Sequence, residues 1–319
     1  MNNNSTISES VGTKPILLVA LGGNALIRKG QAGTIKEQFA NLRGPLGQIA
    51  ALAERYRIVI THGNGPQVGN LLLQQECCEA APKLPLEILV AQTQGQIGYM
   101  IESTLDGEFM RRGMSRHLVS LLSYVVVDRN DPAFAAPSKP IGPVYSEARA
   151  AALPFPTGRT PKGFRRLVAS PRPVAIVEIK EIRRLMDLDF IVICCGGGGI
   201  PVIREGREFH GVDAVVDKDL ASARLATELP ADLLLMATDV DGAYLDYHQP
   251  TQRFLKTMTV AEANRYLAEG HFGGGSMAPK VEAGIEFVRQ GGKKAVIASI
   301  DSITAAIAGR AGTVINGER

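Results

Sequence analysis

Two lysines stand in settings that could stabilise a phosphoryl group during its transfer. Lys218 lies between two aspartates, and Lys280 follows a glycine run at the start of a segment with helical spacing. Phosphoryl transfer asks for little covalent chemistry from a protein, because its main needs are positive charge on the moving group and an in-line arrangement of oxygens. Lone lysines are usually solvated surface groups, so these two need support from their surroundings.

Asp219 follows Lys218 directly, and its carboxylate could orient the neighbouring ammonium groups without taking a proton from a substrate. A plainer interpretation is that Asp219 caps the N-terminus of a helix over residues 220–227. The two roles are compatible.

Four glycine-containing loops follow segments that are typical of strands. Glycine lets the backbone approach a ligand closely, and a helix that begins next directs unpaired N–H groups at an anion. A single loop of this kind is often only a tight connection, but parallel-sheet topology would bring several to one edge. Neither the nicotinamide pattern GxGxxG after the first strand nor the Walker pattern GxxxxGK[ST] is present. The loops are LGGN at 21–24, THGNGP at 61–66, CGGGGIP at 195–201 and TDVDG at 238–242.

The elements that must position these loops alternate between strand-like and helical patterns. Helical apolar spacing occurs at 38–56 and 276–290, and the expected strands are 16–21, 57–61, 118–127, 190–194, 233–238 and 295–299. This alternation predicts a mostly parallel sheet with helices on both faces. Prolines are dense from Arg129 to Pro173, a stretch too long for a linker in a compact chain, so we expect an inserted subdomain or lid there.

Composition narrows the class of protein. The chain has 319 residues, 45% of them hydrophobic, and its 35 lysines and arginines nearly balance its 32 aspartates and glutamates. No basic stripe with aromatics is present, so we expect no nucleic-acid partner. No apolar run approaches the roughly 18 residues of a membrane span, and the polar segment Met1–Lys14 resembles a disordered tail rather than a secretory signal, which indicates a cytoplasmic protein without a membrane partner.

The four cysteines occur as two adjacent pairs, Cys77-Cys78 and Cys194-Cys195. Neither pair matches a CxxC metal spacing, and adjacent cysteines have poor geometry for a mutual disulfide. We interpret them as reduced thiols that pack.

Seven separated motifs, in the family's order, together resemble carbamate kinase. They are VALGGNAL at 19–26, THGNGPQVG at 61–69, NDPAF at 130–134, KPIG at 139–142, GGGGIP at 196–201, DKD at 217–219 and GSMAPK at 275–280. The resemblance implies an amino acid kinase fold, an open three-layer αβα sandwich with a mostly parallel central sheet and a small protruding lid. It also implies a homodimer.

The implied organisation is a tail at 1–14 followed by a single domain at 15–319. The N-terminal half, about 15–190, would bind the phosphoryl acceptor and carry the lid, about 129–173. The C-terminal half, about 191–319, would bind ATP or ADP. The stretch PFPTGRTPKG at 154–163 departs from the family pattern, so the lid's details are the least specified part.

Residue roles also follow from the resemblance. The catalytic set is Lys139, Lys218, Asp219 and Lys280, with Lys139 reaching down from the lid. Many superfamily relatives carry a lysine where this chain has Ala20, and Lys218 would supply the missing charge. Residues expected to bind the acceptor and phosphoryl group are Gly22, Gly23, Asn24, Gly63, Asn64, Gly65, Gly197 and Gly198. Residues expected to bind the nucleotide are Thr238, Asp239, Val240, Asp241, Tyr244, Gly275, Ser276 and Met277.

Asn24 and Asn64 offer amides suited to a small planar acceptor, although asparagine is also common in turns. His62 is more readily explained as a structural residue than as a base, because a carbamate oxygen is already anionic. The sequence has no dedicated metal cage, as expected if Mg²⁺ is held mainly by nucleotide phosphates.

The function indicated is reversible phosphoryl transfer, in which carbamoyl phosphate and ADP give ATP and carbamate. Two alternatives stay open: a related kinase that phosphorylates another small acid, and a catalytically weak nucleotide-binding paralogue. The missing fingerprint disfavours a nicotinamide oxidoreductase. The sequence leaves open whether the reaction serves arginine or purine catabolism.

Overall fold

The strand β1 (Ile16–Leu21) is buried on both sides and lies in the middle of the main sheet. Leu17 and Val19 pack into one core cluster, whereas Leu18 and Ala20 pack into another. Successive side chains of a strand point to opposite faces, so an uninterrupted apolar strand requires cover on both. The computed structural model, which describes residues 14–78, 80–273 and 276–317, provides that cover.

The main sheet has eight strands in the order β15-β17-β16-β12-β1-β2-β9-β3. In the part of this order from β16 to β3, each strand is parallel to the strand beside it. Strand β17 runs antiparallel to β16. This confirms the predicted αβα architecture with a mostly parallel sheet. The strands besides β1 are β2 (Arg57–His62), β3 (His117–Ser120), β9 (Phe190–Ile193), β12 (Leu233–Thr238), β15 (Thr257–Thr259), β16 (Lys294–Ser299) and β17 (Thr313–Asn316).

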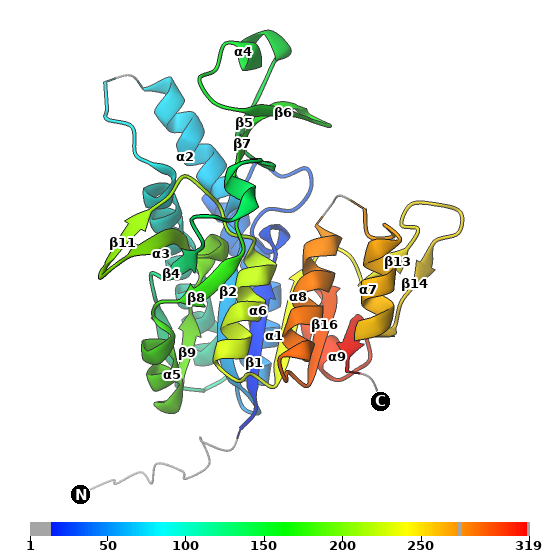
Figure 1. Ribbon diagram of the computed structural model, residues 1–319. Helices are drawn as coiled ribbons and strands as arrows, with labels where there is room; N and C mark the ends of the chain where they lie inside the picture. Colours follow the sequence, from blue (N-terminus) through cyan, green and yellow to red (C-terminus); the bar gives the residue numbers. More distant parts are fainter. Residues whose placement is uncertain (1–13, 79, 274–275, 318–319) are drawn as a thin grey trace, which may run out of the picture.

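Helices form a layer on each face of this sheet (Figure 1). One layer contains α1 (Ile35–Leu52), α3 (Leu86–Arg111) and α9 (Ile303–Ile307). The other contains α5 (Ile179–Asp187), α6 (Lys218–Glu228), α7 (Val260–Ala268) and α8 (Met277–Arg289).

Helix α1 begins about one turn before the helical spacing predicted it. The Thr34 hydroxyl accepts a hydrogen bond from the Glu37 amide at 3.3 Å, and the Glu37 carboxylate accepts one from the Thr34 amide at 2.8 Å. This capping box satisfies two amides that the first turn leaves without intrahelical partners.

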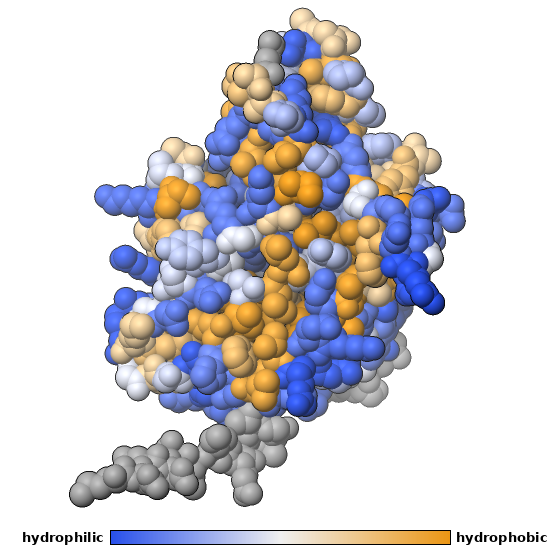
Figure 2. Space-filling model, turned by 90° about the vertical axis from the view of Figure 1, so that its left-hand side faces the viewer, coloured by the Kyte–Doolittle hydropathy of each residue, from blue (hydrophilic) through white to orange (hydrophobic). Residues whose placement is uncertain are grey.

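Two smaller sheets lie beside the sheet edge that carries the glycine loops. A four-stranded sheet contains β4 (Tyr124–Val127), β8 (Pro173–Ile176), β10 (Ile200–Glu205) and β11 (Glu208–Gly211). A three-stranded sheet contains β5 (Lys139–Tyr145), β6 (Thr157–Thr160) and β7 (Gly163–Val168), and with α4 (Glu147–Ala151) it forms the top of the molecule (Figure 1). Seen from the side, this part stands as a narrow projection above the body (Figure 2).

The proline-dense segment therefore includes a small sheet of its own, which we call the lid sheet (β5, β6 and β7). It contacts α2 (Gly65–Cys77), whose Gly69 approaches Gly142 of β5. The predicted domain bounds stay a prediction, and nearly all of the predicted tail lies outside the described residues.

One expectation about the strands and one about the cysteines are wrong. The apolar run 118–127 is not one strand, because the chain leaves the main sheet after β3 and enters the four-stranded sheet at β4. Buried Ser123 marks the crossing: its amide donates to the Gln94 side chain at 2.9 Å, and its carbonyl accepts from the Ile200 amide at 2.8 Å.

The cysteines also differ from each other. All four are free thiols, but only Cys194 and Cys195 are buried, whereas Cys77 and Cys78 are exposed at the end of α2. The expectation that all four thiols pack is therefore wrong for Cys77 and Cys78. Among the described residues, no helix has the length and apolar character to cross a membrane.

We expect Gly22→Ala to lower the free energy of unfolding by about 1–3 kcal/mol, the usual effect of overpacking. A Cβ at Gly22 would lie 2.8 Å from the carbonyl oxygen of Ala237, which accepts the Gly22 amide hydrogen bond from the adjacent strand. Gly23→Ala is the matched control, since a Cβ there would meet nothing within 4 Å. Urea unfolding of both variants checks this, and equal stabilities would contradict it.

Candidate functional site

The four glycine loops meet at one edge of the main sheet. Strands β12, β1, β2 and β9 are consecutive, parallel neighbours, so the loops that follow them emerge together. The Gly22 amide donates to the Ala237 carbonyl at 2.9 Å, and the Gly63 amide donates to the Leu21 carbonyl at 3.0 Å. Each loop thus extends the hydrogen bonding of its strand before it turns, which fixes its backbone.

These loops surround a cavity of about 320 Å³, which we call the phosphoryl cavity. All four predicted catalytic residues line it. Of the eight residues expected at the acceptor and phosphoryl site, seven line it as well: Gly22, Gly23, Asn24, Gly63, Asn64, Gly65 and Gly197. The eighth, Gly198, lies beneath the wall, where a Cβ would meet the Val216 carbonyl oxygen at 2.2 Å.

Asp219 is nearly buried between the two lysines of this cavity. The Lys280 ammonium donates to Asp219 Oδ2 at 2.9 Å, and the Lys218 ammonium pairs with Oδ1 of the same carboxylate. Burial pushes the pKa of Asp219 upward, but the adjacent charges of Lys218 and Lys280 outweigh it and bring the pKa to about 2. The carboxylate is therefore ionised at neutral pH and holds both ammonium groups at the cavity wall.

Lys218 and Lys280 reach this point from two different helices. Lys218 is the first residue of α6, and Lys280 lies in the first turn of α8, where its ammonium also donates to the Ser276 carbonyl at 3.3 Å. Burial lowers the pKa of Lys218, and the Asp219 carboxylate opposes that shift. The charges are thus aimed at the space where two helices begin.

Asp217, not Asp219, caps α6. The Asp217 carboxylate accepts the amide of Asp219 at 2.9 Å and that of Leu220 at 3.4 Å, so the helix begins at Lys218 rather than at 220. The Asp219 side chain is turned towards the lysines and is unavailable for capping. The capping interpretation of Asp219 is therefore wrong by two residues.

Lys139 enters the phosphoryl cavity from the first strand of the lid sheet. Its ammonium donates to Asp217 Oδ2 at 3.0 Å. Lys139 therefore lies against the short acidic segment that contains Lys218, which is 79 residues away in the chain.

Glycines are required where the loop after β9 passes the loop after β2. Gly197 has a φ of +68°, and a Cβ there would lie 2.1 Å from the Asn64 side-chain nitrogen. That nitrogen donates to the Thr93 hydroxyl at 2.8 Å, which fixes the orientation of the Asn64 amide. The close approach holds Asn64 at the cavity wall.

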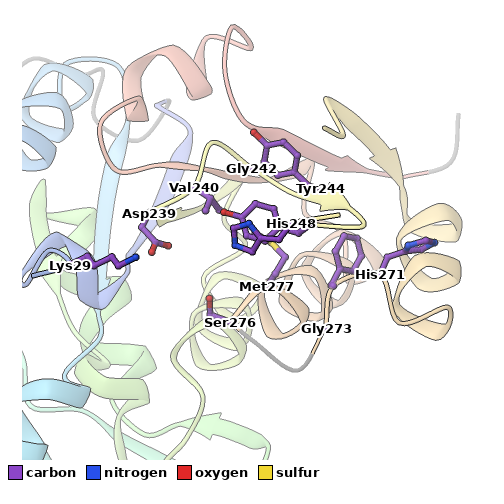
Figure 3. A pocket seen from close by; sticks show the side chains of 12 residues that line it. Lys29, Asp239, Val240, Gly242, Tyr244, His248, His271, Gly273, Ser276 and Met277 are labelled. Atoms are coloured by element: carbon purple, nitrogen blue, oxygen red, sulfur yellow. The ribbon is translucent and has the colours of Figure 1, made fainter. Parts of the chain in front are cut away.

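A second cavity of about 560 Å³ adjoins the first, with Asp239 and Ser276 lining both. We call it the outer cavity. Val240, Tyr244 and Met277, all expected at a nucleotide site, line it together with residues that sequence reasoning missed (Figure 3). The missed residues are Lys29, Tyr247, His248, His271, Phe272 and Gly273, whereas Gly242 belongs to the glycine loop 238–242 that the sequence already indicates.

The missed residues come from loops without periodic patterns. Lys29 reaches in from the loop between β1 and α1 and points towards Asp239 (Figure 3). The run HFGGG at 271–275 could have indicated His271 and Phe272, since it directly precedes α8.

Three residues expected at the nucleotide site need separate mention. Thr238 is buried and lines the phosphoryl cavity rather than the outer one. Asp241 lies on neither cavity but on a different one beside Lys256 and Arg310, although its neighbours Val240 and Gly242 line the outer cavity. Gly275 lies outside the described residues.

His62 is buried and lines neither cavity. Its Nδ1 lies 3.1 Å from the Gly63 carbonyl oxygen, and its ring is so close to Gly196 that a Cβ there would lie at 2.5 Å. Burial lowers the pKa of His62 to about 4. The hydrogen bond with Gly63 opposes this shift, and the positive charge of Lys218 adds to it. A neutral, packed imidazole of this kind fits a structural role.

Comparisons with known proteins by family model, by sequence and by structure all find relatives of the same family. The amino acid kinase family model matches residues 15–299. Carbamate kinase from Thermococcus kodakarensis is 47% identical over 309 residues, covering 94% of this chain and 98% of that protein. Carbamate kinase 2 from Enterococcus faecalis is 44% identical with the same coverage. The structure of carbamate kinase from Giardia lamblia bound to AMP-PNP superimposes with a TM-score of 0.89 at 38% identity, covering 96% of this chain and 99% of that one.

His62 makes the stability of the protein sensitive to mild acid. Because its pKa is about 4 when folded and about 6.5 when unfolded, the unfolded chain binds the proton first as the pH falls. The free energy of unfolding is therefore highest above pH 6.5 as far as His62 is concerned. It falls between pH 6.5 and 4, and at pH 5 the loss is about 2 kcal/mol.

We therefore expect urea unfolding at pH 7 and pH 5 to show a smaller acid-induced loss for His62→Gln than for the unsubstituted protein. The comparison between the two proteins cancels the carboxylates that titrate in both. An identical loss would mean that His62 is readily protonated in the folded state.

Proposed function

This chain belongs to the carbamate kinase family, and from that premise we propose that its two cavities bind the two partners of a reversible phosphoryl transfer. Carbamoyl phosphate and ADP would give ATP and carbamate, which decays to ammonia and bicarbonate. The phosphoryl cavity would hold the acceptor and the moving group, and the outer cavity the nucleoside. The single observation that carries the assignment is the Lys218–Asp219–Lys280 arrangement, buried at the junction of four glycine loops.

The chemistry requires only that charge be held in place. In the ATP-forming direction an oxygen of the ADP β-phosphate attacks phosphorus, and the bond from phosphorus to the carbamate oxygen breaks. The leaving carbamate is an anion, so no protein group has to donate a proton. Lys218 and Lys280 would face the negative charge on the transferred group, which preorganised cations stabilise most strongly in a site that excludes water.

The acceptor end would be bound by the loops after β1 and β2. Asn24 and Asn64 line the cavity beside Gly22, Gly23 and Gly63, so amide groups and backbone N–H groups are available there. Lys139 would close the site from the lid sheet and exclude water when substrates are bound. The lid position of Lys139 and its ion pair with Asp217 support this role.

The nucleotide would extend from the phosphoryl cavity into the outer cavity. Tyr244, Tyr247 and Phe272 provide apolar surface for a base, and Lys29 provides positive charge near the junction. The Giardia lamblia relative bound to AMP-PNP supports a nucleotide substrate.

We propose Mg²⁺ as the cofactor, held mainly by the phosphates. The described residues contain no group of three or more His, Cys, Asp or Glu that could hold a metal. The exposed Asp239 carboxylate lies where the cavities join, and one carboxylate plus substrate phosphates is a usual Mg²⁺ environment. Bound there, the ion would neutralise phosphate charge.

We further propose that the protein is a cytoplasmic homodimer. The family resemblance supports this assembly. Apolar side chains also gather on the face shown in Figure 2. The four-stranded sheet carries three exposed large hydrophobic residues, Tyr124, Val174 and Phe209. Analytical ultracentrifugation would test it.

A coupled assay for ATP formation from ADP and carbamoyl phosphate tests the proposed reaction directly. We expect turnover with carbamoyl phosphate, and little turnover with acetyl phosphate in its place. Preference for another acyl phosphate would favour the related kinase of different specificity. Tight ATP binding without turnover would favour the nucleotide-binding paralogue.

Lys218→Ala and Lys280→Ala should each lower kcat by about a hundredfold or more, because each removes a cation from the transferred group. Lys293→Ala is the matched control, since Lys293 forms an exposed ion pair with Asp232 away from both cavities. Near-UV circular dichroism should show all three variants folded. Rates close to those of the unsubstituted enzyme would refute the roles given to Lys218 and Lys280.

Asp239→Asn should raise the Mg²⁺ concentration needed for the half-maximal rate by about tenfold, the usual scale for losing a group that helps to hold a metal. Asp241→Asn is the matched control, because this nearby acidic residue lines a different cavity. Titration of Mg²⁺ at fixed ADP measures both variants. An equal shift in the two would mean that Asp239 contributes only general negative charge.

A further inference from the structure

We propose that Asp217 is a positioning residue that holds the lid lysine Lys139 in the phosphoryl cavity and ties its placement to the start of α6. The inference rests on the proposed function, in which Lys139 meets the transferred group. It assigns to the first aspartate of the DKD motif a role distinct from that of the second.

The two oxygens of the Asp217 carboxylate have different partners. Oδ1 accepts the amides of Asp219 and Leu220 at 2.9 and 3.4 Å, which caps α6. Oδ2 accepts the Lys139 ammonium at 3.0 Å. One carboxylate therefore connects the lid to the helix turn that carries Lys218 and Asp219.

The burial of the two partners shows which one holds the other. The Asp217 side chain is 14% exposed and is fixed by its capping bonds, whereas the Lys139 side chain is 43% exposed. A lysine side chain has four rotatable bonds and a strongly hydrated ammonium, so without a fixed partner it would sample solvent. Asp217 is the rigid member, and it keeps Lys139 at the cavity before any substrate enters.

The segment around Asp217 is connected to the lid at further points. The Val215 amide donates to the Ala169 carbonyl at 3.0 Å, just beyond β7, and Ala169 forms a β-bridge with Ala214. Arg166 of β7 also pairs with the exposed Asp213. The base of the lid thus lies along residues 213–217, and Asp217 is the member of this segment whose ion pair lies in the cavity.

The Asp217→Asn variant separates the two tasks. Asparagine caps helices about as well as aspartate, so α6 should keep its start, but the charged partner of Lys139 is lost. We expect kcat/KM for carbamoyl phosphate to fall about tenfold, the scale of one charge-assisted hydrogen bond, with KM for ADP little changed. Asp213→Asn is the matched control: it removes an exposed lid ion pair outside the cavity, and we expect less than about a twofold change.

A double-mutant cycle then tests whether Asp217 acts through Lys139. In a Lys139→Ala background, Asp217→Asn should cause no further loss, since the partner it would position is absent. Losses that multiply in the double variant would overturn the proposal. Activity of Asp217→Asn equal to that of the unsubstituted enzyme would also overturn it.

Hydrogen exchange provides a readout that does not depend on turnover. Amides of residues 139–145 should exchange severalfold faster in Asp217→Asn and in Lys139→Ala, to the same extent, while those of 218–228 stay unchanged. Faster exchange in 218–228 would assign the effect to the helix cap and overturn the proposal. If the unsubstituted protein forms no ATP from carbamoyl phosphate, the proposed function fails, and the exchange comparison still decides whether Asp217 holds Lys139.

Discussion

The rest of the site depends on the ion pairs that the buried, ionised Asp219 carboxylate forms with two lysines. A charge in the protein interior is stable only when it is paired and hydrogen-bonded, a requirement that Lys218 and Lys280 together meet for Asp219. Those lysines come from the first turns of α6 and α8, and the requirement therefore fixes how the starts of these two helices face each other. The same pairing offsets the repulsion between the two ammonium groups before a substrate arrives.

The parallel sheet makes this arrangement possible. Because β12, β1, β2 and β9 end at one edge, four loops can share a small space, and glycines let them approach within contact distance. Gly197 shows the constraint most clearly, since its positive φ and its contact with Asn64 leave no room for a side chain. The loops are thus held by strands below and by each other, which gives the rigidity that a site for in-line transfer needs.

Sequence reasoning was most successful where pattern and chemistry agree. The bounds of β1 and β12 were predicted to the residue, because both are apolar runs that end at glycine- or aspartate-containing loops. The run 118–127 was predicted as one strand because nothing local shows that Ser123 is bonded by Gln94 and Ile200, far away in sequence. Asp217 could have been recognised, since it precedes α6 at the position that an N-cap takes. Lys29, by contrast, lies in a loop whose path depends on tertiary packing, so no local signal marks it.

The distribution of charge suggests why a lid is built into this fold. Lys139, Lys218 and Lys280 line the phosphoryl cavity together with Asp217, Asp219 and Asp239, so three cations face three carboxylates. With Lys139 bound to Asp217, these six side chains of the cavity have no net charge. Two of its cations belong to the rigid body and are bound to Asp219, whereas the third, Lys139, is brought by the lid sheet. Because Asp217 already binds Lys139, the third cation is in place before a substrate enters, and its position depends on an element outside the main sheet.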